Sequence, residues 1–340
     1  MRLPAIVLLA LLGPVAVRAD STWRRELVDL TRLEVLNTVA KKYTHSIAPD
    51  GSAFAVFDAN VVRLVDPKDG RELQTLTGHG GMIHDSGWSR DGRLVATSGY
   101  DETVRVWEAA TGKQILNCRP LASFACSVAF SPDGKWVAAG SSDDGQLKII
   151  DVATGKKVRE IQTPDTALYA LEFTPDGTHL IVNHTVMNRG DTSVRIYKVS
   201  DSTEVKTGIK GPATSFALSR DGRSFVYSTP RGTLILLETA GWTEQRQFDG
   251  HQTGAASLAF HPSGRFLASS GRDGAVRIWD SDSGKQVNTL PIKGEVDSRL
   301  VFGAEGNTLV VATADATVKL FGRRDPLNGS ATPPKPADGK

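Results

Sequence analysis

The sequence predicts an all-β chain folded as a seven-bladed β-propeller with four antiparallel strands in each blade. Three observations support this: a tight-turn motif occurs seven times, each repeat holds four short strand patterns, and an N-terminal strand pattern completes the last repeat. The repeat is 41 to 45 residues long, as measured between the glycines that close each turn: Gly51, Gly92, Gly134, Gly177, Gly222, Gly264 and Gly306.

The turn motif joins the first and second strands of each repeat. Its fullest form is Phe130-Ser131-Pro132-Asp133-Gly134. Proline fixes φ, and the Asp-Gly pair accepts a positive φ, so the chain reverses tightly between two strands. In the second repeat, small apolar residues at 94–98, alternating β-branched residues at 103–107 and the segment 114–116 supply the other three strands. No helical pattern competes in the mature chain.

The last repeat supplies only three strands and ends at Phe321. The N-terminal segment 32–36 lies about as far before the first turn as the outer strands lie before later turns. We therefore expect this segment to pair with the last strand and close blade seven. Closure of the ring removes the exposed edges that would template aggregation.

Both ends of the chain are expected to lie outside the propeller, which takes residues 20–321. Arg2, an apolar run at 3–12 and a cleavage pattern ending at Ala19 predict a signal peptide over residues 1–19. The apolar run is shorter than the ~20 residues of a bilayer span. We expect an exported protein, periplasmic or extracellular, without membrane insertion. The proline-rich segment 322–340 is predicted to be disordered.

The charge balance argues against nucleic acid as a partner. The formal net charge is +2, and removal of Arg2 and Arg18 with the signal peptide lowers it to zero. No block of lysine and arginine supplies the basic patch that phosphate binding needs.

Cys118 and Cys126 are the only cysteines. The repeat places Cys118 near the outer edge of one blade and Cys126 on the inner strand of the next. That separation exceeds the ~7 Å between Cα atoms that a disulfide allows. We expect two buried thiols, although an exported chain with an even cysteine count leaves pairing open.

Two repeats share a tighter signature with spacings of 19, 3 and 6 residues. This signature resembles the WD40 family over residues ~27–321, and the resemblance implies a buried hydrogen-bonded chain within each of the two blades. Other blades carry different residues at the tryptophan position, so exported TolB-like propellers, which share the Ser-Pro-Asp-Gly turn, are a second choice. The two tetrads are His79, Ser98, Asp101 and Trp107, and His251, Ser270, Asp273 and Trp279.

We expect the tetrads to be structural, with each aspartate orienting a histidine, rather than acid–base centres. The sequence has no nucleophile elbow, phosphate-binding loop, zinc-protease motif or Cys-x-x-Cys pair. The histidines are scattered over different repeats, so no metal site is predicted. We therefore expect neither catalytic residues nor a cofactor.

The sequence favours a non-catalytic, monomeric scaffold that binds protein partners through one face of the propeller. This face is formed by the loops between second and third strands and by the connections from one repeat to the next. The candidate contacts are Tyr100 and Arg272, each directly before a tetrad aspartate, and Met187 and Arg189 in an insertion at 183–190.

The alternative is an enzyme or small-ligand binder that uses the central channel. Charged residues pointing inward from several first strands would favour it. Small residues in those strands argue against it: Ala129, Ala170, Ala217 and Ala259.

Overall fold

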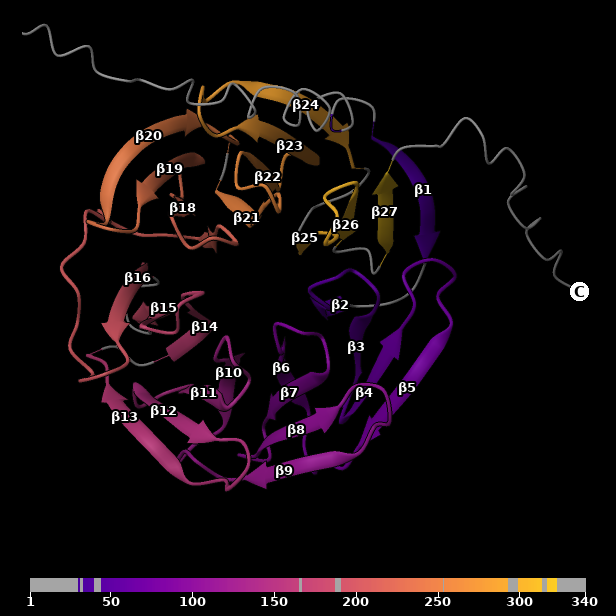
Figure 1. The fold of residues 1–340 in the computed structure, drawn as a ribbon, viewed down its shortest axis with the longest axis vertical. Helices are drawn as coiled ribbons and strands as arrows, with labels where there is room; N and C mark the ends of the chain where they lie inside the picture. Colours follow the sequence, from indigo (N-terminus) through magenta and orange to yellow (C-terminus); the bar gives the residue numbers. More distant parts are fainter. Residues whose placement is uncertain are drawn as a thin grey trace, which may run out of the picture.

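The computed structural model describes residues 30, 33–39, 44–164, 167–186, 191–252, 254–292, 299–313 and 317–322. In this part of the chain, seven antiparallel sheets stand around a central axis as the blades of a ring (Figure 1). The seven-bladed propeller predicted from the repeat is confirmed. The signal peptide and residues 323–340 lie outside the described residues, so both assignments stay predictions. Gly322, predicted as the first residue of the tail, instead ends the last strand.

Blades one to three are four-stranded, and we call their strands a to d from the axis outward. Blade one consists of β2 (Thr44–Ile47), β3 (Phe54–Asp58), β4 (Val61–Val65) and β5 (Glu72–Thr77). Blade two consists of β6 (Ile83–Trp88), β7 (Leu94–Gly99), β8 (Val104–Glu108) and β9 (Gln114–Cys118). Blade three consists of β10 (Ala125–Phe130), β11 (Trp136–Ser141), β12 (Gln146–Asp151) and β13 (Lys157–Gln162).

Blades five and six repeat this order. Blade five consists of β17 (Ser215–Leu218), β18 (Ser224–Ser228), β19 (Thr233–Glu238) and β20 (Thr243–Asp249). Blade six consists of β21 (Ala255–Phe260), β22 (Phe266–Gly271), β23 (Ala275–Asp280) and β24 (Gln286–Pro291).

Blade four departs from the pattern. It has three strands, β14 (Ala167–Phe173), β15 (His179–Val186) and β16 (Asp191–Lys198), and a single bridge between Tyr197 and Glu204 stands where the d strand would run. The expectation that the whole insertion at 183–190 forms a loop was wrong. Its first four residues lengthen β15, because they find backbone partners in β16 up to the pair Val186–Asp191.

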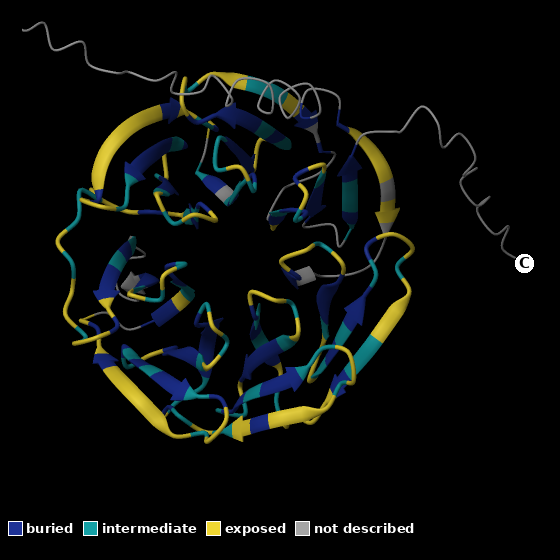
Figure 2. Cartoon of the chain, in the orientation of Figure 1, coloured by how far each residue is buried: buried dark blue, intermediate teal, exposed yellow. Residues whose placement is uncertain are grey.

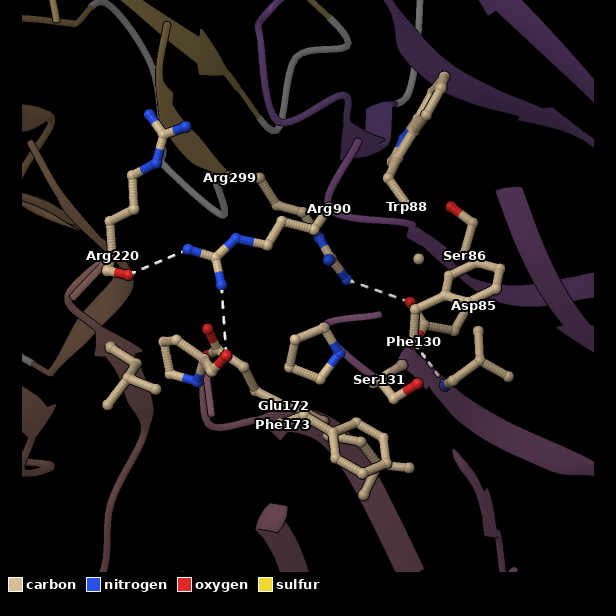
Figure 3. A pocket seen from close by; sticks show the side chains of 18 of the residues that line it. Asp85, Ser86, Trp88, Arg90, Phe130, Ser131, Glu172, Phe173, Arg220 and Arg299 are labelled. Carbon is tan, nitrogen blue, oxygen red and sulfur yellow. Dashed lines mark hydrogen bonds and ion pairs between the residues drawn. The ribbon is translucent and has the colours of Figure 1, made fainter. Parts of the chain in front are cut away.

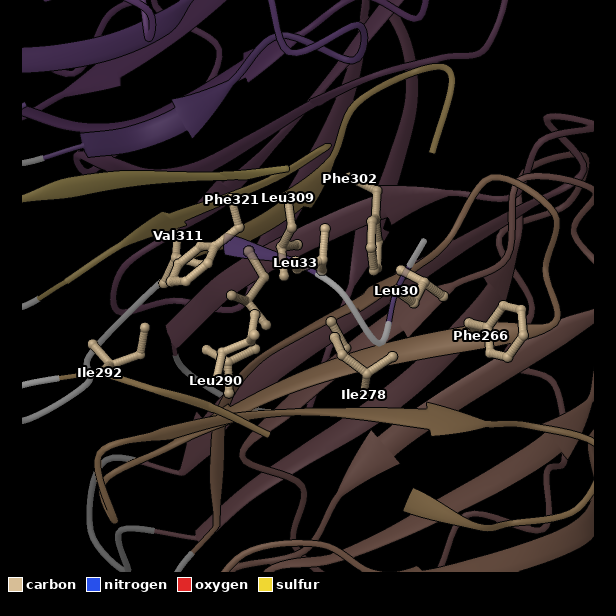
Figure 4. Close-up of a cluster of buried hydrophobic side chains, with 13 residues drawn as sticks. Leu30, Leu33, Phe266, Ile278, Leu290, Ile292, Phe302, Leu309, Val311 and Phe321 are labelled. Atoms are coloured by element: carbon tan, nitrogen blue, oxygen red, sulfur yellow. The ribbon is translucent and has the colours of Figure 1, made fainter. Parts of the chain in front are cut away.

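The ring closes as predicted. Blade seven consists of β25 (Leu300–Phe302), β26 (Thr308–Ala312) and β27 (Val318–Gly322), and β1 (Glu34–Val39) pairs with β27 as its outer strand. Leu30 and Leu33 are buried with residues of blades six and seven, among them Phe302 and Phe321 (Figure 4). The N-terminal segment therefore contributes both the outer strand of blade seven and apolar side chains that pack with blades six and seven. We call this place, where the two ends of the chain close the ring, the seam.

The pattern of burial explains why the sheets hold together. The b strands are buried on both faces, as in β22, where every residue is buried. The d strands expose most of their residues, and they form the exposed rim of Figure 2. Each blade therefore packs its inner strands between two neighbours, and the hydrophobic effect favours the closed ring over separate sheets.

The strand order gives the ring two distinct faces. Because adjacent strands of a blade are antiparallel, the a–b turns lie on one face of the ring. The b–c loops and the d–a connections lie on the other face. We call these the turn face and the b–c face. The turn glycines take the left-handed conformation that the Asp-Gly motif predicts, for example Gly92 at φ 71° and Gly134 at φ 70°. In the described part of the chain, no helix has the length and apolar character to cross a bilayer.

Candidate docking face and central channel

A hydrogen-bonded chain runs through blade two and ends beneath its b–c loop. Trp107 Nε1 donates to Thr97 Oγ1 (2.9 Å), and that hydroxyl lies 2.7 Å from His79 Nε2. His79 Nδ1 lies 3.0 Å from the Asp101 carboxylate. Asp101 also accepts bonds from the backbone nitrogen of Gly80 and from Thr103. The carboxylate thereby joins the d–a connection to the b–c loop.

Blade six repeats the chain. Trp279 Nε1 donates to Ser269 Oγ (2.8 Å), which lies 2.8 Å from His251 Nε2. His251 Nδ1 lies 3.0 Å from Asp273 Oδ1, and Arg277 donates to the other carboxylate oxygen (2.6 Å).

The prediction of Ser98 and Ser270 as the hydroxyl members was wrong by one residue. Side chains alternate along a strand, so Thr97 in β7 shares a sheet face with Trp107, and Ser98 points to the other face. Within the described residues, Ser98 Oγ is buried without a hydrogen-bond partner. Ser270 Oγ instead donates to the carbonyl oxygen of Ser257, at 3.5 Å.

The environment of the networks fits a structural role. The side chain of His79 is 1% exposed, and that of His251 is wholly buried, so no substrate reaches either ring. Burial lowers the pKa of both histidines, which keeps the imidazoles neutral. Burial alone would raise the pKa of Asp101, but hydrogen bonds from Thr103, Gly80 and His79 outweigh it and hold that pKa at about 2.

Blade two uses this frame to present Tyr100 on the b–c face. The Tyr100 backbone nitrogen donates to the Met82 carbonyl oxygen (2.9 Å), and Asp101 follows directly. Gly81 permits the close approach, because a Cβ there would lie 2.9 Å from the Asp101 backbone nitrogen. The backbone of Tyr100 is therefore fixed, and its side chain is 53% exposed.

Tyr100 belongs to a cluster of four rings that spans three blades. Its ring stacks on Phe124 of the next d–a connection, with centroids 4.4 Å apart and planes 24° apart. His84 of β6 lies 5.9 Å from Tyr100 and 6.5 Å from Tyr169 of β14, and its Nδ1 donates to the Cys126 carbonyl oxygen (2.8 Å). We call His84, Tyr100, Phe124 and Tyr169 the aromatic patch.

The patch differs from the other exposed apolar side chains. Among the described residues, Met82, Tyr100 and Tyr169 are the most exposed large hydrophobic side chains, at 62%, 53% and 47%. All three lie at the b–c face of blades two and four. The remaining ones lie on the outer strands of four blades: Val35, Leu36, Leu73, Ile115 and Val158.

Arg272 is exposed at the corresponding position of blade six, but it is not part of the aromatic patch. Met187 and Arg189 lie outside the described residues. The structure thus places Tyr100 in a patch and leaves Arg272 apart from it. Sequence reasoning missed His84, Phe124 and Tyr169, because nothing in their local patterns indicates that neighbouring blades bring them together.

Both cysteines are free thiols. Cys126 Sγ points to the Leu168 carbonyl oxygen of the next blade, at 2.9 Å. Burial raises the pKa of Cys126 to about 12 and that of Cys118 to about 11, so neither is a reactive thiolate near neutral pH.

The central channel contains a cavity of about 360 Å³ lined by the a strands of blades two to five and by Arg299. Asp85 of β6 accepts a bond from the Val128 backbone nitrogen (3.1 Å) and lies 3.6 Å from Arg299 Nη2 (Figure 3). Arg90 reaches from its a–b turn to the carbonyl oxygens of Pro175 (3.3 Å) and Arg220 (3.4 Å) (Figure 3). This side chain links blade two to blades four and five across the turn face.

Glu172 also lines this cavity. Ala170, grouped with Ala129 in the sequence analysis, is not its counterpart: strand pairing matches Ala129 with Glu172, because each lies opposite the third residue of its b strand. Both stand five residues before the turn glycine, which would have found the match. Charged side chains therefore line the channel, which favours a small ligand. In blade four, Glu172 stands where blade three carries Ala129. Within the described residues, no group of histidine, cysteine, aspartate and glutamate forms a metal site.

Comparison with known proteins supports the fold and the repeat. Residues 70–108, 120–151 and 242–280 match the family described as "WD domain, G-beta repeat". An uncharacterized WD repeat-containing protein of Synechocystis is 32% identical over 120 residues, which is 34% of this chain and 34% of that protein. The guanine nucleotide-binding protein subunit beta of Arabidopsis thaliana is 21% identical over 301 residues, 83% of this chain and 76% of the relative.

A further relative is the nuclear distribution protein nudF of Aspergillus niger, 25% identical over 246 residues, which is 71% of this chain and 49% of that protein. The chain thus spans about a third of the Synechocystis relative and about half of the Aspergillus one. WD40 propellers are typically scaffolds for protein interactions. The chain therefore contains repeats that match the WD40 repeat, and it folds as a seven-bladed β-propeller.

Proposed function

We propose that the protein is a non-catalytic, exported scaffold that binds protein partners through its b–c face, with the aromatic patch as the main contact. One observation carries the proposal: the three most exposed large hydrophobic side chains among the described residues gather at this one place. Tyrosine supplies a large contact area at a small loss of side-chain entropy, and it is enriched among residues that dominate binding energy.

The frame beneath the patch supports the same function. The network of blade two fixes the loop that carries Tyr100, and the His84 bond to the Cys126 carbonyl oxygen ties blade two to blade three. A partner that docks there orders few side chains, so more of the interaction energy remains as affinity.

The docking proposal is tested by affinity capture of partners from the native extracytoplasmic fraction. Replacement of Tyr100 and Tyr169 by alanine should weaken capture by at least ~2 kcal/mol, about thirtyfold, without a change in stability. The matched control replaces Leu73 and Ile115, which are similarly exposed on d strands, and it should capture as well as wild type. Equal loss in both variants, or in neither, would contradict docking at the patch.

Arg272 is tested separately, because it lies on another blade from the patch. If one partner covers the b–c face from blade two to blade six, adding Arg272→Ala to the Tyr100 variant should weaken capture further. Unchanged capture would confine the contact to the aromatic patch.

Export is tested by sequencing the N-terminus of the mature protein purified from its native source. Cleavage after Ala19 should leave Asp20 as the first residue. A cytoplasmic protein that retains residues 1–19 would contradict export, but it would leave the docking proposal intact.

A further inference from the structure

Glu172 occupies a position at which blades two, three, five and six carry a small residue. Strand pairing equates it with Gly87, Ala129, Ala217 and Ala259 in the other a strands, each opposite the third residue of its b strand. The a strands converge on the axis, where a small side chain suffices. A glutamate there places a carboxylate in the channel without serving the packing between blades.

The Glu172 carboxylate is partly buried in the channel cavity, and it has no hydrogen bond or ion pair among the described residues. Burial raises its pKa to about 7. Asp85, the other carboxylate of the cavity, has both the Val128 backbone nitrogen and Arg299 as partners. Glu172 is therefore the carboxylate that a bound cation would stabilise, because its charge is not compensated by the chain.

The same cavity has more cations than its carboxylates neutralise. Three arginines line it (Arg90, Arg220 and Arg299), against the two carboxylates Asp85 and Glu172. Arg299 makes one long contact with Asp85, and the Arg220 guanidinium makes no ion pair among the described residues. Guanidinium groups with free donors bind carboxylates, often in bidentate fashion.

We propose that the channel cavity binds a small zwitterion, a free amino acid or a short peptide, whose ammonium group pairs with Glu172 and whose carboxylate pairs with Arg299 and Arg220. The volume of about 360 Å³ admits a ligand of this size. Tyr169 lines the cavity and is also part of the aromatic patch, whereas Arg90 and Arg220 line it at the turn face. The inference does not depend on whether a protein docks at the patch.

The test uses glycylglycine as the probe and saturation-transfer NMR at about pH 7.5, where most of Glu172 is ionised and most of the glycylglycine amino group still carries its proton. Wild-type protein should bind glycylglycine at least tenfold more tightly than propionate or propylamine, each of which carries one of the two charges. Glu172→Ala should lose at least tenfold in affinity. This variant should fold, because blades three, five and six carry alanine at the same position.

Glu244→Ala, which removes an exposed carboxylate from the outer strand β20, should bind glycylglycine like wild type. Arg299→Gln should weaken glycylglycine and propionate alike. Absence of glycylglycine binding to the wild-type protein, or propionate binding of equal strength that survives Glu172→Ala, would overturn the proposal.

Discussion

Blades two and four are copies of the same repeat, but different hydrogen bonds stabilise them. Blade two has four strands, and its network runs from Trp107 to Asp101, which ties the d–a connection to the b–c loop. Blade four has three strands and a single outer bridge. Its histidine, His184, comes from the b strand itself and meets Ser193 and Arg195 of the c strand.

The hydrogen-bond networks of the two blades connect different parts of the chain. The bonds of His184 join strands that the sheet already pairs, and Arg195 continues to Glu204 at the outer bridge (2.8 Å). The bonds of Asp101 join two connections that no sheet pairs. Blade two therefore fixes a loop that presents Tyr100, whereas blade four stabilises only its own sheet and places Glu172 in the channel. A degenerate repeat keeps the fold but changes what the blade offers to other molecules.

The largest effect is expected at the seam. Like blade four, blade seven is not stabilised by a tryptophan network. Deletion of residues 20–40 removes β1 together with the buried side chains of Leu30 and Leu33. The edge of β27 becomes exposed, so we expect an aggregation-prone protein in size-exclusion chromatography. A soluble truncated protein of unchanged stability would show that closure does not need this segment.

The second largest effect is expected when the carboxylate is removed from the hydrogen-bond network of blade two or blade six. Asp101→Ala and Asp273→Ala should each lower the free energy of unfolding by about 3 kcal/mol, because a buried histidine loses its acceptor in both variants. In addition, the Gly80 backbone nitrogen loses its partner in the first variant and Arg277 in the second. Asp176→Ala, at the exposed turn of blade four, should lower it by about 1 kcal/mol or less. Urea unfolding monitored by fluorescence measures all three, and equal small losses would remove the contrast between the blades.

Exchange of one hydroxyl tests which residue belongs to the network. Thr97→Val should cost about 2 kcal/mol, since the Trp107 and His79 nitrogens lose their shared partner. Ser98→Ala should cost much less, because its hydroxyl has no partner among the described residues. The opposite order in urea unfolding would restore Ser98 to the network.

The smallest effect is a pH dependence in blade four. Burial raises the pKa of Glu172 from 4.5 to about 7, so the folded state binds more protons than the unfolded chain between these values. This contribution to stability is present at low pH and is lost as the pH rises through 7. Glu172→Gln should therefore be about 1 kcal/mol more stable than wild type at pH 8, with the difference shrinking toward pH 4.5. A difference that is independent of pH would contradict a buried, titrating carboxyl.

The fold could be predicted from the sequence because the turn motif acts locally. Proline and Asp-Gly fix each reversal, and the spacing between turns leaves room only for short strands. The errors concern position along a strand. Ser98 is one residue from Thr97 and therefore points to the other face of its strand, and Ala170 is two residues from Glu172, which pairs at the position of Ala129. The aromatic patch could not be predicted, because only closure of the ring brings Tyr100, Phe124 and Tyr169 together.

Site-specific photo-crosslinking tests the central claim, that partners dock on the b–c face at the aromatic patch. A benzophenone amino acid placed at Tyr100 should crosslink a protein partner in the native extracytoplasmic fraction. The same group placed at Lys135, which is exposed beside an a–b turn on the opposite face, should not. Crosslinks from Lys135 without crosslinks from Tyr100 would contradict the claim and place docking on the turn face.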